Sequence, residues 1–210
     1  MTAQERGFFC QLLASLFYSP DQELAKQIQE RRLYSFFDKY IQSWGEEEGF
    51  LKGFLMEEES ENLLRDLENE YARLFSGSSQ ESISLVESFH KLWTNDPQCS
   101  LPFASEKGLL MGDSAIHLLE IYRECSLEIS VEFKWCPDHI VVELEFLSYL
   151  YERATDIEIK KFIENHLDWI PFLEEELKRF HPHPFYLSLL GVLSLFLNVE
   201  KRRLEIGNNG

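Results

Sequence analysis

Residues 137–151, Pro-Asp-His-Ile-Val-Val-Glu-Leu-Glu-Phe-Leu-Ser-Tyr-Leu-Tyr, decide the fold. Asp138 follows a proline and is among the residues preferred at a helix N-cap. The positions after it are apolar around most of a helical circumference, which is typical of a buried helix. We therefore expect a central helix from Asp138 to Tyr151, capped by Asp138.

The same segment carries a small polar patch. His139 and Glu143 are four residues apart, so they fall one turn apart on the expected helix, directly after Pro137 and Asp138. One interpretation is a capped helix with an ordinary polar pair. The other is a carboxylate and imidazole cluster that grips a guanidinium, because arginine donates a planar fork that a carboxylate accepts bidentately. The residues alone leave both interpretations open.

Outward from this helix, apolar residues recur at spacings of three and four, and the alternation typical of strands is nearly absent. Asp113 or Ser114 is expected to cap a helix of its own. Glycine- and proline-rich breaks separate the stripes, the longest at residues 95–112. The sequence predicts an all-α, single-domain multi-helix bundle over residues 1–210, with residues 95–112 as a hinge candidate. The other expected helices cover residues 8–17, 33–41, 63–75, 116–122, 157–166, 171–180 and 185–199.

The net charge of the chain indicates which classes of partner it can attract. The chain has 20 Lys and Arg against 37 Asp and Glu, a formal net charge of -17. Such a field repels a phosphate backbone, so nucleic acid is not an expected partner. The same field attracts a basic peptide, although acidity also serves simply to keep a protein soluble.

The ends of the chain predict a cytoplasmic protein. The first residues lack the basic start and small-residue cleavage site of a secretory signal. The apolar run at residues 185–197 is shorter than a membrane span and is interrupted by Ser188, Gly191 and Ser194, so no stable membrane insertion is expected. The cysteines form no C-x-x-C pair and are expected to be free thiols. They are Cys10, Cys99, Cys125 and Cys136.

No sequence pattern indicates catalysis. Phosphate-loop, dinucleotide, zinc-protease and nucleophile-elbow motifs are absent. His181 and His183 are close together, but a metal site requires further ligands that the sequence does not place beside them. We expect no enzyme activity, no cofactor and no metal.

Several segments, taken in order, resemble the signatures of the TorD/DmsD/NarJ-type (nitrate reductase delta subunit-like) chaperones of molybdoenzyme maturation. Their order and spacing match that family along almost the whole chain. One departure is Leu85-Val86, where the family often has proline and an aromatic residue. The segments are residues 69–77, 87–88, 110–112, 137–146 and 166–172.

The resemblance implies an all-helical, TorD-like fold and a cytoplasmic chaperone. Such a protein would bind the twin-arginine signal peptide of a molybdopterin-containing oxidoreductase catalytic subunit and assist its cofactor insertion and assembly before export. Independently of the resemblance, the hinge candidate at residues 95–112 makes either a monomer or a swapped dimer the expected state. The residues assigned to signal-peptide binding by the resemblance and the polar patch are Leu74, Phe75, Glu87, Ser88, Pro137, Asp138, His139 and Glu143.

Two other functions stay open. A non-exported assembly subunit that remains bound to a redox enzyme complex would have the same sequence features. A weak nucleotide hydrolase would require a phosphate cradle and a set of metal-binding carboxylates, which the sequence does not display.

Overall fold

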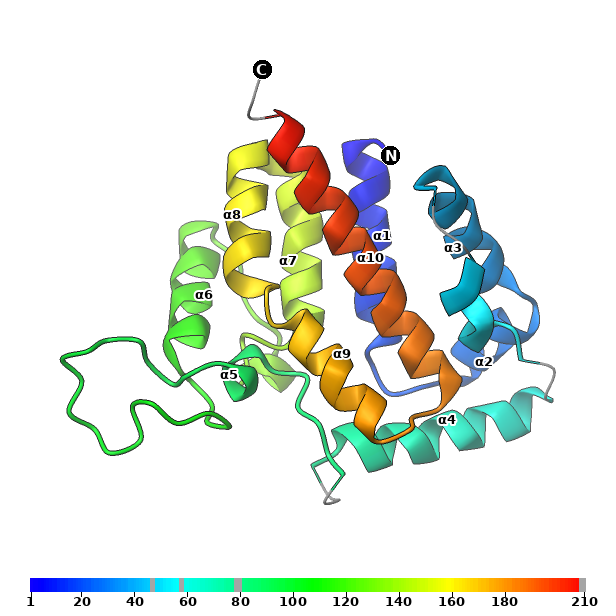
Figure 1. Ribbon diagram of the computed structural model, residues 1–210, viewed down its shortest axis with the longest axis horizontal. Coiled ribbons are helices and arrows are strands. Elements are labelled where there is room, and N and C mark those ends of the chain that lie inside the picture. Colours follow the sequence, from blue (N-terminus) through cyan, green and yellow to red (C-terminus); the bar gives the residue numbers. More distant parts are fainter. Residues whose placement is uncertain (46–47, 57–58, 78–80, 208–210) are drawn as a thin grey trace. The chain divides into compact units, whose positions relative to one another are not determined.

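The computed structural model describes residues 1–45, 48–56, 59–77 and 81–207 (Figure 1). Over these residues the regular structure is helical, and the sole strand-like feature is an isolated antiparallel bridge between Val86 and His139. The prediction of an all-α fold is confirmed.

The chain divides into two compact units. The prediction of one domain with a hinge at 95–112 stays a prediction. The first unit comprises Met1–Phe17 and Ser84–Phe172, and the second Tyr18–Ile83 and Leu173–Gly210.

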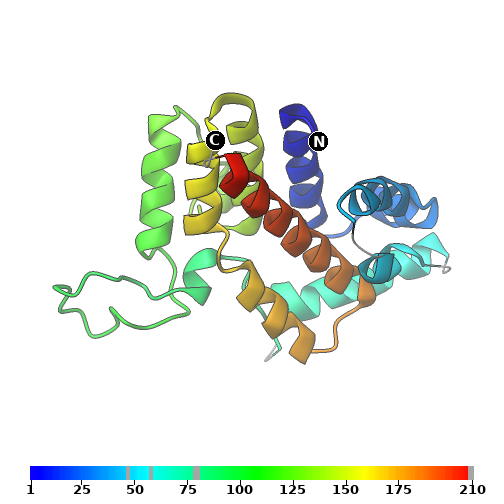
Figure 2. The same ribbon diagram turned by 45° about the horizontal axis from the view of Figure 1, so that its top comes forward.

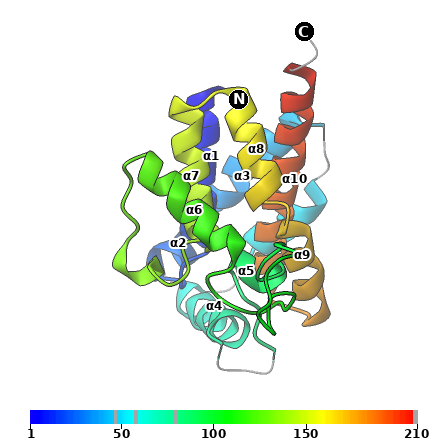
Figure 3. The same cartoon turned by 90° about the vertical axis from the view of Figure 1, so that its left-hand side faces the viewer.

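The first unit is built around α7, which the sequence predicted as its central helix. Helix α1 packs along α7, and the two are neighbours in Figure 3. Gly7 permits this approach, because a Cβ there would lie 3.2 Å from the hydroxyl of Ser148. The helices of this unit are α1 (Ala3–Leu16), α5 (Glu87–His90), α6 (Asp113–Glu124), η2 (Val131–Phe133), α7 (Ile140–Arg153), α8 (Asp156–His166) and the start of α9 (Ile170–Arg179).

A long loop joins α5 to α6 in the first unit (Figure 2). The loop folds back on itself, since Trp93 N–H donates to the carbonyl of Glu106 at 2.8 Å and Thr94 N–H donates to that of Ala104 at 3.0 Å. The hydroxyl of Thr94 then donates to Asp113, the first residue of α6, at 2.8 Å. The loop is therefore tied to the helix that follows it.

The second unit contains a close backbone contact between η1 and α10. Gly53 N–H donates to the hydroxyl of Ser188 at 2.8 Å. A second tie comes from the buried Tyr186, whose hydroxyl donates to the carbonyl of Leu67 at 3.1 Å. The helices are α2 (Gln22–Gln29), α3 (Arg32–Ser43), η1 (Glu48–Phe54), α4 (Ser60–Phe75), the remainder of α9 and α10 (Pro184–Gly207).

Two predicted caps are wrong. Helix α7 begins at Ile140 and its N-cap is His139, whose ring nitrogen accepts from Val141 N–H at 3.3 Å. Asp138 lies in the turn before the helix, and its carboxylate bonds to Ser88. Helix α6 begins at Asp113 itself, with Gly112 at the N-cap and no side-chain cap.

Two further observations bear on the sequence predictions. Among the described residues no helix is both long and apolar enough to cross a membrane. All four cysteines are free, as predicted.

Candidate functional site: a buried polar network

Two signature segments meet in the first unit. Glu87 N–H donates to the carbonyl of Asp138 at 2.9 Å, and Ile140 N–H donates to that of Leu85 at 2.8 Å. These bonds flank the bridge between Val86 and His139. The start of α5 is thereby held against the turn that leads into α7, although the two segments are far apart in the sequence.

The carboxylate of Asp138 bonds to Ser88. It accepts from the backbone N–H of Ser88 at 2.8 Å and, through a very short hydrogen bond, from the hydroxyl. Asp138 thus satisfies a free N–H in the first turn of α5 instead of capping its own helix. Burial raises the pKa of Asp138, and the bonds from Ser88 oppose this. Its second oxygen, Oδ1, is buried without a hydrogen-bond partner.

Glu87 is fully buried and has two partners. Its Oε2 lies 3.0 Å from Nδ1 of His166, and its Oε1 lies 2.5 Å from Nζ of Lys91. Lys91 also contacts Asp168 at 2.5 Å. Burial alone would raise the pKa of Glu87, but His166 and Lys91 outweigh it and hold the pKa below its usual value. Glu87 is therefore an ionised carboxylate inside the unit.

Glu143 is also fully buried, but its environment has the opposite effect. Its Oε2 accepts from the indole N–H of Trp169 at 3.1 Å, whereas Oε1 has no partner. Burial, followed by the negative charge of Glu87, raises the pKa of Glu143 well above its usual value. The shift in the pKa of Glu143 is therefore opposite in direction to that of Glu87.

His166 links the network to the surface. Its Nε2 lies 2.8 Å from Nδ1 of His117, and the two rings are stacked. His166 is buried, whereas His117 on α6 is exposed. The network thus joins α5, α6, α7 and α8 by side-chain contacts, and its interior residues are closed to a peptide in this conformation.

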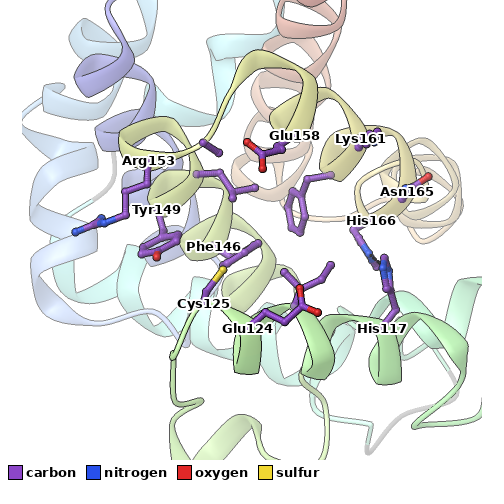
Figure 4. A pocket seen from close by; sticks show the side chains of 14 residues that line it. His117, Glu124, Cys125, Phe146, Tyr149, Arg153, Glu158, Lys161, Asn165 and His166 are labelled. Atoms are coloured by element: carbon purple, nitrogen blue, oxygen red, sulfur yellow. Dashed lines mark hydrogen bonds between the residues drawn. The ribbon is translucent and has the colours of Figure 1, made fainter.

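A cavity of about 420 Å³ lies beside the two histidines, between α6, α7 and α8 (Figure 4). Phe146 and Phe162 form part of its apolar lining, and His117 and His166 point toward each other at one side. Arg153 stacks over the ring of Tyr149 at 4.6 Å. The cavity therefore combines an aromatic wall with polar groups of both charges.

Of the predicted site residues, Glu87, Ser88 and Asp138 come together as described. Glu143 joins them, because its carboxylate lies within 4.8 Å of ligand atoms of Glu87 and His166. Pro137 is buried, and its carbonyl accepts from the hydroxyl of Tyr122 at 3.3 Å.

His139 and Glu143 do not form the predicted side-chain pair. The ring of His139 packs on Phe133 with centroids 4.8 Å apart, and Glu143 turns to Trp169. Burial lowers the pKa of His139 to about 4. His139 is therefore neutral at physiological pH, as its acceptor role at the N-cap requires.

Leu74 and Phe75 belong to the second unit. Leu74 is fully buried in α4, and its carbonyl accepts from Ile83 N–H at 2.6 Å. Phe75 packs edge-on against Tyr71 and Tyr186 at 5.4 Å. Both residues take part in the packing of their own unit.

The sequence reasoning missed four members of the network. His166 and Trp169 lie in a segment that carried the family resemblance, but nothing in the sequence assigned them a role. Lys91 follows Glu87 by four residues, a spacing that could have indicated their ion pair, whereas the partner of His117 is His166, 49 residues away. A search for polar residues on otherwise apolar helix faces could have found His166.

The fold and the network define the class: over the described residues this is an all-helical protein in which buried polar residues hold helices together. The nitrate reductase delta subunit family model matches residues 45–183, and the chain belongs to that family. The resemblance to this family found in the sequence is therefore confirmed.

Curated relatives agree with the family match. The chain is 26% identical to the chaperone protein TorD of Vibrio parahaemolyticus, over 96% of this chain and 98% of that protein. It is 23% identical to the chaperone protein TorD of Vibrio cholerae, over 92% and 89%. A chaperone protein TorD from Salmonella newport is 27% identical over about half of each chain.

Proposed function

We propose that the protein is a cytoplasmic chaperone that binds the twin-arginine signal peptide of a molybdopterin-dependent oxidoreductase and holds the enzyme during cofactor insertion. The family match and the chaperone relatives support molybdoenzyme maturation. The observation that carries the proposal is the meeting of Glu87, Ser88 and Asp138, since residues singled out by the resemblance form one network.

Charge supports a basic ligand. The chain carries a net charge of -17, and a field of that sign steers an arginine-bearing peptide toward it. Six of the proposed binding residues are buried, so they act on a peptide by holding the surface in shape or after a local opening of their own unit. These residues are Leu74, Glu87, Ser88, Pro137, Asp138 and Glu143. Phe75 and His139 are half-buried, and the residues of each unit are tested by variants in that unit.

The test is a titration of the full-length protein with the signal peptide of a candidate client, identified by capture from cells and mass spectrometry. We expect the twin-arginine peptide to bind and a twin-lysine version to bind at least tenfold more weakly, because lysine lacks the planar fork. Equal affinity for both peptides would contradict arginine recognition. Recovery of the chain as a permanent subunit of the mature enzyme would instead favour an assembly subunit.

A second measurement separates binding from folding. Asp138→Asn removes a charge but keeps an acceptor oxygen, so the fold should persist. If the carboxylate of Asp138 binds the arginines of the peptide, the affinity of Asp138→Asn for the peptide should be at least tenfold lower, while its melting temperature changes little. Phe75→Leu in the second unit probes the apolar part of the peptide in the same way.

A further inference from the structure

We propose that Glu87, Glu143 and His166 form a binding site for a divalent transition-metal ion, of which Zn²⁺ and Mn²⁺ are the best probes. One oxygen of each carboxylate and one imidazole nitrogen lie within 4.8 Å of one another. The three side chains are at most 2% exposed. Two carboxylate oxygens and an imidazole nitrogen are donors that these ions accept in proteins.

One polar atom of each residue lies on the side of the other two residues. Each of the three side chains uses its other polar atom to contact an outer partner, which fixes its orientation. Side chains that bind metals are usually oriented in this way. The inner atoms are Oε2 of Glu87, Nδ1 of His166 and Oε1 of Glu143; the first two bond to each other, so an ion would have to replace the proton between them. The outer partners are Lys91 for Glu87, Trp169 for Glu143 and His117 for His166.

Two of these atoms already have the spacing of neighbouring ligands. Oε2 of Glu87 and Nδ1 of His166 are 3.0 Å apart. Two atoms bound to one ion at about 2.1 Å lie roughly 3.0 to 3.4 Å apart when they are adjacent. A small movement of Glu143 completes the set.

An independent observation comes from Oε1 of Glu143. This oxygen is buried, belongs to a fully buried side chain and accepts from no donor among the described residues. A buried polar atom without a donor is costly, so it requires either a proton shared with Glu87 or a ligand that the side chains do not provide. A metal ion at the centre of the set gives it one.

The charges around the set favour a cation. Glu87 and Glu143 lie in the set, Asp138 bonds to the same helix turn as Glu87, and Lys91 is the cation in contact with Glu87. Asp168 also forms an ion pair with the ammonium group of Lys91, so the charge of Lys91 is shared between two carboxylates. The alternative compensation is a proton held between the two carboxyls. A metal ion would have to displace it, so binding should release protons.

The cavity in Figure 4 adjoins the set at His166, which lines it together with His117, whereas Glu87 and Glu143 are not among its lining residues. The sequence predicted no metal because the three ligands come from three helices, α5, α7 and α8, and have no characteristic spacing.

The test uses the full-length protein after treatment with a chelator and dialysis. Zn²⁺ and Mn²⁺ are titrated while the melting temperature and the bound metal per chain are measured. We expect one ion per chain and a saturable rise in melting temperature. Co²⁺ should give visible absorption bands, because a nitrogen and oxygen ligand set at a buried site distorts its coordination from that in water.

Variants assign the ion to the site. Glu143→Gln and His166→Gln should abolish stoichiometric binding, and His117→Gln should weaken it by about 10- to 100-fold, since it removes an outer partner. The matched control is His181→Asn, in a loop of the second unit with a backbone φ of 47° that asparagine tolerates. It should bind metal like the wild type.

Three results would overturn the proposal. Wild-type protein that binds no ion and gives no Co²⁺ bands has no such site, and this result requires no variant to fold. Glu143→Gln protein that binds as tightly as the wild type excludes the buried set. Loss of binding in His181→Asn places the ion at the loop histidines.

Discussion

The carboxylate of Asp138 accepts hydrogen bonds from both the backbone N–H and the hydroxyl of Ser88, 50 residues earlier in the chain. The pair joins the beginning of α5 to the beginning of α7. Asp138 is fully buried and Ser88 is 1% exposed, so water cannot replace either partner. The relationship is tertiary, and it predicts a different response to mutation from that of a helix cap.

Asp138→Ala should lower the free energy of unfolding by about 2–4 kcal/mol, because it leaves two buried donors of Ser88 without an acceptor. Asp138→Asn should cost only about 1 kcal/mol, since its amide oxygen still accepts one of them. Urea unfolding measures both values. The double variant with Ser88→Ala should lose less than the sum of the single losses, because the two residues share one interaction. Additive losses would show that Asp138 stabilises the fold through contacts other than the one with Ser88.

The lowered pKa of His139 predicts that the free energy of unfolding decreases at acid pH. Its folded pKa is lowered to about 4 from an unfolded value of 6.5, so the unfolded chain binds protons more readily between these values. The stabilisation is therefore present above about pH 6.5 and is lost as the pH falls toward 4. Protonation would also end the N-cap, because Nδ1 could no longer accept from Val141. Between about pH 7 and pH 4.5 the loss should be about 2–3 kcal/mol.

His139→Asn isolates this effect. Asparagine is a preferred N-cap residue and does not titrate, so the variant should match the wild type within about 1 kcal/mol at neutral pH. At acid pH it should be the more stable of the two. Denaturant unfolding at both pH values measures the difference. Parallel pH profiles for the two proteins would mean that His139 does not titrate in this range.

The periodicity of the sequence was sufficient to predict most helices. The stripe after Pro137 gave α7, and the breaks at 95–112 and 181–183 are loops as expected. Helix α2 was missed because its buried face is small, with only Leu24, Ala25 and Ile28. Helix α10 continues eight residues beyond the predicted end at Val199, where Leu204 is buried and Arg203 bonds to Glu200 at 2.9 Å.

The site was predicted only in part. Local preference placed Asp138 at a cap, but the chain is still extended at His139 and pairs there with Val86, so the helix starts later. The contact of His166 with Glu87 spans 79 residues, and no spacing rule reaches that far. The family resemblance identified the segments that meet, and the structure supplied their partners.

Salt should slow the capture of a client peptide. The chain carries a net charge of -17 and the proposed ligand is cationic. Screening shortens the reach of exposed charges from about 10 Å at 0.1 M salt to about 3 Å at 1 M. We expect the association rate, measured by stopped-flow fluorescence, to fall by about tenfold over this range while the dissociation rate changes less. A peptide with citrulline in place of arginine is the control, and an unchanged rate for the twin-arginine peptide would remove any role of the acidic surface in capture.

Gly53→Ala should be the most damaging small substitution in the second unit. A Cβ at this position would lie 2.1 Å from the carbonyl oxygen of Pro184 and 2.6 Å from the hydroxyl of Ser188. The first of these is backbone at the start of α10, which cannot move without displacing the helix. Separation of η1 from α10 would also break the bond from Gly53 N–H to Ser188. We expect a loss of about 2–4 kcal/mol, in the range of overpacking combined with a broken buried hydrogen bond.

Gly49→Ala is the matched control on the same 3-10 helix. No atom lies within 4 Å of a Cβ at Gly49, so alanine meets no obstacle there. The substitution should leave stability unchanged or raise it by up to about 1 kcal/mol, because alanine restricts the unfolded chain. Thermal and urea unfolding of the two variants, side by side with the wild type, provide the comparison. Equal stabilities for Gly53→Ala and Gly49→Ala would mean that η1 does not pack on α10 through Gly53 in solution.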